Sequence, residues 1–226
     1  MMERENLRFQ GLDWYSQDNA PVVVVGGAGG IGSWLSFFLA RANFNVTLAD
    51  FDTVEEHNIG GQLFKRNQIG SYKAEAVGRN VSDFSTNTIN AQIVKITEET
   101  ATHEFMFSAF DNMDARRAMF KVWKRSWNSM NRPIFIDGRL NAEQFQIFCV
   151  TPENADEYER IHLFNDSEVE DAPCSAQQTT HTAAMIAGHM VGFFTNHITN
   201  INLRETVREL PFMYEYFTPM NLTVSE

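Results

Sequence analysis

Residues 22–35 read VVVVGGAGGIGSWL, and this stretch decides the fold. Four valines followed by glycine are typical of a strand buried on both faces of a parallel sheet. Gly27, Gly29 and Gly32 fit the pattern GxGxxG, whose glycines permit a tight turn, a close approach of backbone to phosphate, and close packing of helix on strand. A helix over about residues 30–42 would point its N-terminus, with unpaired N–H groups and a positive dipole end, at an anion. The stretch predicts a nucleotide site but does not distinguish NAD from ATP.

The segments that follow alternate between strand and helix patterns. Further strands are expected over 45–50, 87–96, 105–110 and 133–138, and helices over 71–84 and 112–130. With right-handed crossovers these segments build an open, doubly wound, mostly parallel sheet of the Rossmann-like α/β class. Alternation over 143–150 predicts an antiparallel strand after a turn at Leu140–Ala142, and residues 212–217 alternate in the same way. The sheet is therefore expected to be extended by antiparallel strands.

The chain is expected to form one domain over residues 1–226, with an N-terminal arm over 1–20. Residues 152–171 are acidic and weakly patterned, which indicates a surface loop or short helix that borders the site. A long helix is predicted over 175–198.

That helix carries Ala184, Gly188 and Gly192 at intervals of four residues, a stripe of small side chains that lets another helix approach closely. We favour packing in the core as its role, with a homodimer contact as the alternative.

Composition excludes several function classes. The 226 residues carry a formal net charge of -11, which opposes non-specific attraction to nucleic acid or to an anionic membrane. The two uncharged stretches, 21–40 and 172–203, contain too many glycines or polar residues to be membrane spans. The N-terminus lacks the apolar region of a secretory signal, and the two cysteines form no disulfide framework, so a cytoplasmic protein is expected.

Polar residues follow the second and fourth predicted strands. Asp50 ends the second strand, where an acid accepts hydrogen bonds from ribose hydroxyls. Lys73 opens the next helix, and Asp111 lies just beyond the fourth strand. A lysine and an acid at the same sheet edge as a phosphate-binding turn suit a triphosphate with Mg²⁺, which takes only one or two carboxylates. Taken alone, Lys73 would be a solvated helix charge and Asp111 a helix cap.

The order of these motifs resembles a known family. Over about residues 21–200 the sequence is similar to the ubiquitin-activating superfamily, in its small ThiF/MoeB/HesA-type members. The motifs that carry the resemblance are, in order, GxGGxG, DxDxVxxxN, a Gln four residues after that Asn, IGxxKA, and DN after a strand. The resemblance implies adenylation of a carboxylate with ATP and Mg²⁺, usually at the C-terminal glycine of a ubiquitin-like protein or peptide. It also implies an enzyme that works as a homodimer.

The resemblance assigns roles residue by residue. Gly27, Gly29, Gly30 and Gly32 would cradle phosphates, Asp50 would hold the ribose, Asp52, Asn58 and Gln62 would line the nucleotide, Lys73 would contact phosphates, and Asp111, followed by Asn112, would serve Mg²⁺. Chemistry supports such a set, because a carboxylate that attacks the α-phosphate brings two anions together, and cations offset that repulsion.

One position departs from the family pattern. Where the family reads NLNRQ this chain reads NIGGQ, so Gly61 replaces an arginine expected at the phosphates. Arg66, Arg139, or Arg8 acting across a dimer could supply the missing charge. Arg139 follows the fifth strand and could instead clamp the incoming carboxylate or form an ordinary surface salt bridge.

The two cysteines invite different interpretations. Cys174 precedes the long helix at the position where ThiF-like relatives hold a sulfur-carrying cysteine, so it could form a covalent acyl or persulfide bond or be merely a small residue. His181 could act as its base, although a satisfied helix histidine is the simpler interpretation. Cys149 lies in an alternating strand and is expected to be buried and inert.

Two rival functions stay open at this point. One is an NAD(P)-dependent oxidoreductase, although no convincing acid or base for hydride transfer is visible. The other is an ATP-binding scaffold in which loss of the arginine at position 61 has abolished catalysis.

Overall fold

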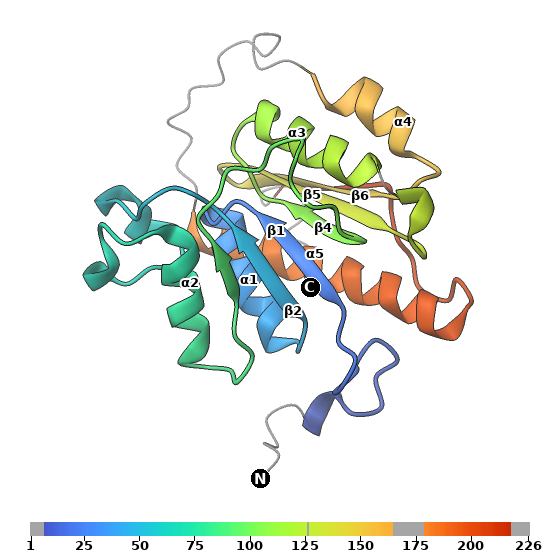
Figure 1. Ribbon diagram of the computed structural model, residues 1–226, viewed down its shortest axis with the longest axis horizontal. Helices are drawn as coiled ribbons and strands as arrows, with labels where there is room; N and C mark the ends of the chain where they lie inside the picture. The colour runs from blue at the N-terminus through green and yellow to red at the C-terminus, as the bar shows by residue number, and fades with distance from the viewer. Residues whose placement is uncertain (1–6, 126, 165–178, 218–226) are drawn as a thin grey trace, which may run out of the picture.

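A computed structural model of the chain describes residues 7–125, 127–164 and 179–217, and all structural statements below refer to these residues. They form one seven-stranded sheet in the order β3-β2-β1-β4-β5-β6-β7, with helices on both faces (Figure 1). The strands are β1 Val22–Gly26, β2 Asn45–Ala49, β3 Asn90–Gln92, β4 Phe105–Ser108, β5 Ile134–Asn141, β6 Gln144–Val150 and β7 Met213–Phe217. The first five strands are parallel, and β6 and β7 continue the sheet antiparallel. The predicted fold class is confirmed.

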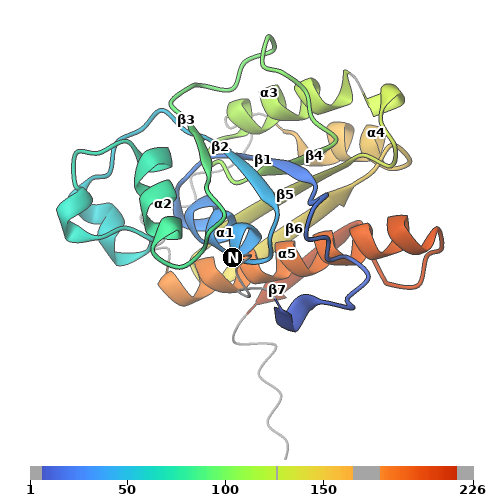
Figure 2. The ribbon, with the colours of Figure 1, turned by 60° about the horizontal axis from the view of Figure 1, so that its bottom comes forward.

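The helices divide between the two faces of the sheet (Figure 2). The α-helices are α1 Gly30–Arg41, α2 Lys73–Ser82, α3 Met113–Lys124, α4 Ala155–Glu157 and α5 Thr180–Leu203. Short 3-10 helices are η1 Leu7–Phe9, η2 Glu56–Gly60, η3 Arg66–Gln68 and η4 Trp127–Ser129, and η5 Tyr158–His162 is a π-helix. Side chains of α1, α2 and α5 pack in one core cluster, and those of α3, α4 and η5 pack in the other.

The valine run behaves as its pattern predicts. Val23 and Val25 point into the α1 and α5 side of the core, whereas Val24 points into the α3 side, and all three are buried. A central strand with both faces covered needs apolar side chains in both registers, which explains why the run is continuous and not alternating.

Two strand predictions need correction. The third strand covers only Asn90–Gln92, not 87–96, because it is an edge strand that pairs with three residues of β2. The turn predicted at Leu140–Ala142 lies at Ala142–Glu143, since β5 continues to Asn141 and pairs there with Gln144. Ala142 adopts a left-handed φ of 53°, which lets a two-residue turn reverse the chain.

The prediction that the small-residue stripe of the long helix packs in the core is wrong for Gly188 and Gly192. Gly188 and Gly192 are exposed, and a Cβ added at either would meet no atom within 4 Å. The opposite face of α5, which includes Ile186, Met190 and Phe194, packs on α1 and the sheet. Packing of this stripe in the core is therefore ruled out within the described chain. The predicted start of the helix at residue 175 lies outside the described residues.

The N-terminal arm packs on its own chain at the amino edge of the sheet. Asn202 at the end of α5 donates a hydrogen bond to the carbonyl of Asp13, and Asn43 donates one to the carbonyl of Ser16. Of the acidic stretch 152–171, residues up to 164 are described, and they form α4 and η5 with Tyr158 fully buried, so this part is more than a surface loop. None of the described helices combines the length and apolar character that a membrane crossing requires.

Candidate nucleotide-binding site

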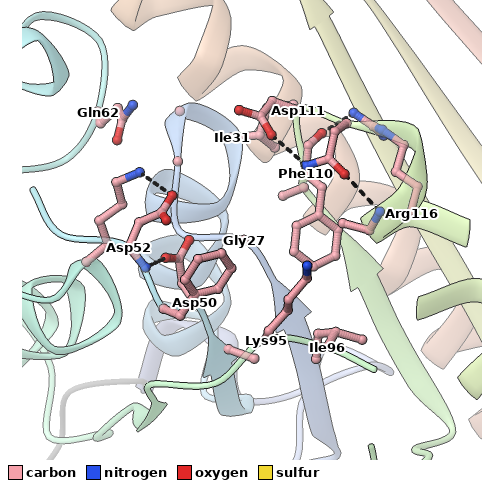
Figure 3. A pocket seen from close by; sticks show the side chains of 18 of the residues that line it. Gly27, Ile31, Asp50, Asp52, Gln62, Lys95, Ile96, Phe110, Asp111 and Arg116 are labelled. Carbon is pink, nitrogen blue, oxygen red and sulfur yellow. Dashed lines mark hydrogen bonds and ion pairs between the residues drawn. The ribbon is translucent and has the colours of Figure 1, made fainter. Parts of the chain in front are cut away.

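A cavity of about 840 Å³ opens at the carboxyl edge of the parallel strands (Figure 3). This volume falls in the range of sites that hold a small molecule or cofactor. Nearly all of the predicted ligand-binding residues line it, namely Gly27, Gly29, Gly30, Asp50, Asp52, Asn58, Gln62, Lys73, Asp111, Asn112 and Arg139. Gly32 does not line it, and its role is in packing.

The three motif glycines differ in what a side chain at each position would meet. Gly27 has a φ of +91°, and a Cβ there would lie 2.8 Å from the carbonyl oxygen of Ala109. A Cβ at Gly32 would lie 1.8 Å from the carbonyl oxygen of Gly27, so α1 could not sit this close to the turn with any side chain there. Gly29 meets no atom within 4 Å. The chain itself therefore does not require glycine at position 29, but backbone access for a ligand does.

Asp50 is fixed by the backbone around it. One carboxylate oxygen accepts a hydrogen bond from the N–H of Ala28 at 2.7 Å, and the other accepts one from the N–H of Asp52 at 2.7 Å. Burial raises the pKa of Asp50 above its ordinary value, against the opposing effect of these hydrogen bonds and of the Lys73 charge. Each carboxylate oxygen keeps a second acceptor site for a ligand hydroxyl.

Lys73 is held against the cavity and is not a solvated helix charge. Its amino group lies 3.1 Å from a carboxylate oxygen of Asp52, and its side chain is only 13% exposed. The N–H of Lys73 also donates to the carbonyl of Asp52. The start of α2 is thus tied to the loop that follows β2, which keeps the ammonium at the cavity wall.

The loop that contains the family motif carries an unsatisfied group. Asn58 is buried, and its side-chain oxygen accepts a hydrogen bond from the N–H of Glu55. The Oε1 atom of Gln62 is also buried, and no described residue donates to it. Because an unpaired buried polar atom costs free energy, this amide is a candidate for pairing with a ligand.

Asp111 stands free of the helix cap that its position suggested. Asn112 caps α3, because its Oδ1 accepts a hydrogen bond from the N–H of Ala115. The Nδ2 of Asn112 donates to the Asp111 carboxylate at 3.1 Å. Asp111 is exposed at the rim of the cavity, and its carboxylate lies near Ile31 in the first turn of α1 (Figure 3).

The donor set at this rim fits Mg²⁺ in its usual nucleotide-bound form. Asp111 and Asp114 both line the cavity, and the described residues contain no group of three or more potential ligands that would hold a metal alone. Mg²⁺ typically binds to one or two carboxylates and completes its coordination with waters and phosphate oxygens.

The far side of the cavity is built from buried ions. Asp137 lies within β5, at its last parallel pair with β4, and is fully buried, with an ion pair to Arg116 through one oxygen and to Arg139 through the other, at 2.8 Å. The Tyr158 hydroxyl donates to the same carboxylate at 2.9 Å. Burial opposes ionisation of Asp137, but the two guanidinium groups outweigh it and hold the pKa of the carboxyl below its ordinary value.

Arg139 lines the cavity but is already engaged. Besides Asp137, it donates to the carbonyl of His162 at 2.8 Å and stacks 4.6 Å from the ring centre of Phe148. Its side chain is 14% exposed and its partner Asp137 is not exposed at all, so the alternative of an ordinary surface salt bridge is wrong. This residue joins η5 to the sheet.

The sequence did not predict several other residues that line the cavity, among them Lys95, Phe110 and Arg116. Lys95 and Phe110 follow strand ends, which is the signal that could have found them. Arg116 carries no local signal, because its partners, the Asp137 carboxylate and the carbonyls of Gly138 and Phe110, lie on other elements or before its own helix.

The other candidates lie elsewhere. Of the three arginines proposed to replace the one missing at Gly61, only Arg139 lines the cavity, whereas Arg66 is exposed on η3 and Arg8 lies on η1 in the N-terminal arm. Cys149 is buried, and burial raises the pKa of its thiol, so the expectation that it is inert is supported.

Cys174 lies outside the described residues. His181 is exposed in the first turn of α5.

Residues 7–222 match the ThiF family. The chain belongs to this family. The match spans nearly the whole sequence, including the glycine turn, the loop with Asn58 and Gln62, and the far wall. No curated protein matches the sequence.

Solved structures with the same fold come from related proteins. E. coli tRNA N6-threonylcarbamoyladenosine dehydratase, TcdA, solved with ATP, superposes with a TM-score of 0.66 at 17% identity and covers 88% of this chain and 94% of its own. E. coli MccB, also solved with ATP, gives 0.62 at 16% identity, covering 91% of this chain and 66% of its own. PaaA gives 0.61 at 15% identity, covering 87% and 60%. This ThiF-family chain therefore spans only about two thirds of MccB and less of PaaA, and at these identities the likeness shows the fold.

Proposed function

We propose that this ThiF-family chain binds ATP in the cavity and adenylates a carboxylate. The observation that carries the proposal is that the glycine turn, Lys73 and Asp111 line one cavity at the N-terminus of α1. The solved relatives TcdA and MccB, each with ATP, support the choice of ATP over NAD. In the reaction a carboxylate oxygen would form a bond to the α-phosphorus, the bond to the β-phosphate would break, and pyrophosphate would leave with the electron pair.

The residues of the chain suit the charges of this reaction. The first N–H groups of α1 and the ammonium of Lys73 would bind the phosphates, and Asp50 would accept hydrogen bonds from the ribose. Gln62 would pair its unsatisfied amide oxygen with a donor of the bound ligands or their water. Mg²⁺, bound at Asp111, would supply further positive charge against the triphosphate.

The finer parts of the proposal concern the carboxylate and its fate. The family resemblance favours the C-terminus of a ubiquitin-like protein or peptide as the carboxylate. Thr180 at the start of α5 donates to the carbonyl of Gly60 in the loop beside the cavity. Attack of the Cys174 thiol on the acyl adenylate would form a thioester, with AMP as the leaving group. Transfer to this thiol, and a cytoplasmic location, belong to the same proposal.

The exposed stripe on α5 is consistent with a homodimer. Gly188 and Gly192 leave the helix surface open, and α5 carries no Asp, Glu, Lys or Arg from Thr180 to Leu203. Sedimentation of the wild type and of Gly188→Arg tests this part, and a wild type that stays monomeric at all concentrations would exclude it.

Exchange of pyrophosphate into ATP tests the adenylation step. Label should enter ATP only when a carboxyl-terminated peptide substrate is present, and Lys73→Ala and Asp111→Ala should abolish it. Lys121→Ala and Asp83→Ala, which remove exposed charges away from the cavity, serve as matched controls and should retain exchange. Exchange that survives Lys73→Ala or Asp111→Ala would remove that residue from the mechanism.

Nucleotide-binding measurements beside the exchange assay separate the rival functions, and mass spectrometry tests the thiol step. ATP binding without exchange with any carboxylate would favour the scaffold, and binding of NADH in place of ATP would favour an oxidoreductase. Cys174→Ala should retain exchange and lose any adduct visible by mass spectrometry. An adduct that persists in this variant would exclude Cys174 as its site.

A further inference from the structure

The cavity has two ends on either side of Asp50. In Figure 3 Gln62 and Asp111 lie above Asp50, Gly27 and the ring of Phe110 lie beside it, and Lys95 and Ile96 lie below it. The cations and N–H groups proposed to bind phosphate belong to the upper end. If Asp50 binds the ribose, the base must occupy the lower end, because ribose separates base from phosphate in any nucleotide.

The lower end has the character of a base-binding slot. Phe51 and Val94, the neighbours of Asp50 and Lys95 in the sequence, line the cavity and are 54% and 44% exposed, so they present apolar surface to a ligand. Ile96 and Phe110 line it as well. Flat apolar surfaces of this kind gain free energy when an aromatic ring covers them.

Lys95 is the one polar side chain among these apolar residues. It lies between Val94 and Ile96, three residues beyond the end of β3, and its amino group points toward Phe110 (Figure 3). The chain just before Lys95 is tied to the sheet, because the carbonyl of Gln92 accepts a hydrogen bond from the N–H of Asp50.

The two cavity lysines differ in their partners. Lys73 is paired with Asp52. No described residue forms a hydrogen bond or ion pair with the amino group of Lys95. An ammonium has three donors and no acceptor, so a ligand for Lys95 must present an acceptor.

We propose that Lys95 reads the base of the nucleotide by donating a hydrogen bond to a ring nitrogen of a purine held between the apolar walls. Adenine offers N1, N3 and N7 as acceptors. This inference rests on the proposed function for the identity of the ligand as ATP, but not on the adenylation step.

The test measures equilibrium binding of ATP and of its 1-deaza, 3-deaza and 7-deaza analogues, in which one ring nitrogen is replaced by CH. Wild type should bind one of the three analogues about tenfold more weakly than ATP, as expected for loss of one charge-assisted hydrogen bond. Lys95→Met should bind ATP about tenfold more weakly and should no longer distinguish that analogue from ATP. Lys121→Met, which removes an exposed lysine from α3, should behave as wild type.

Two outcomes would overturn the proposal. If wild type binds ATP and all three analogues equally, no ring nitrogen accepts a hydrogen bond that matters for binding. If Lys95→Met weakens the binding of every nucleotide by the same factor, Lys95 acts through its charge alone. Pyrophosphate exchange gives an independent readout: if exchange occurs and the deaza pattern is absent, only this inference fails. If wild type binds no ATP, both it and the proposed function fail.

Discussion

The two walls of the cavity are built in opposite ways. The near wall, defined by the glycine turn 27–32, Asp50, Gln62 and Lys73, leaves polar groups directed at the cavity, including the unpartnered Gln62 Oε1. The far wall presents Arg116 and Arg139 to the cavity, and the buried Asp137 and Tyr158 behind them pair with these two arginines. Polar groups without protein partners mark where a ligand binds, whereas a closed set of buried charges supports the shape of the site.

The carboxylates of the two walls show the difference most directly. Asp50 directly follows β2, and Asp137 lies where the parallel pairing of β4 with β5 ends. Asp50 accepts only backbone N–H groups, and burial raises its pKa. Asp137 is buried more deeply, yet its pKa is lowered because two guanidinium groups outweigh the effect of burial. We expect substitution in the far wall to change stability and substitution in the near wall to change ligand affinity.

The largest expected effect is on stability, from Asp137→Ala. This change leaves Arg116 and Arg139 buried without their counter-ion, and removal of one partner of a buried pair costs about 3–5 kcal/mol. For a chain of this size the midpoint of thermal unfolding should fall by roughly 10 °C. Glu98→Ala, which breaks an exposed pair with Lys121, is the control and should change the midpoint little. A variant at position 137 as stable as this control would show that the far wall does not hold the fold.

The near wall could be predicted from sequence because its parts are local. The tight turn, the helix N-terminus and the acid after the second strand follow from one strand-turn-helix-strand pattern, and their ligand geometry depends on that backbone. The far wall could not be predicted, since Asp137, Arg116 and η5 meet only after α3 and the β5–β6 hairpin have folded. Arg139 was found as a strand-end residue, but its buried partners were not.

Two other errors have the same physical origin. Periodicity shows that Gly188 and Gly192 share one face of α5, but it does not show which face meets the core. Lys95 was missed because residues 87–96 were interpreted as a strand throughout, and β3 ends at Gln92 because it has one neighbour and only three paired residues. The ends of edge strands depend on pairing that the local sequence does not encode.

The next effect in size is on affinity, from Gly29→Ala. A Cβ at this position meets no atom of the described chain, so the midpoint of unfolding should hardly change. The methyl group would instead occupy the space where backbone approaches phosphate, and ATP should bind at least about tenfold more weakly. Gly78→Ala on α2 is the matched control, since its methyl would meet only Ile89, at 3.9 Å, and it should stabilise the helix by about 0.5–1 kcal/mol with unchanged ATP binding. Equal ATP affinity in both variants would remove position 29 from the binding site.

The smallest effect is a difference in pH dependence between the two carboxylates, measured without ligand as the unfolding midpoint of wild type minus that of the Asn variant. A lowered folded pKa means that Asp137 contributes stability fully above its unfolded pKa, near 3.8, and loses it as pH falls through the lower folded value. For Asp137→Asn the difference should therefore stay constant from pH 7 to about 4 and shrink below that.

The raised folded pKa of Asp50 has the opposite effect on stability, because ionised Asp50 costs stability at neutral pH and protonation relieves that cost. For Asp50→Asn the difference should shift in favour of wild type as pH falls from 7 toward 4. Parallel profiles for the two positions would contradict the contrast between the walls. They would mean that folding moves the pKa of both carboxyls in the same direction, although only Asp137 is paired with guanidinium groups.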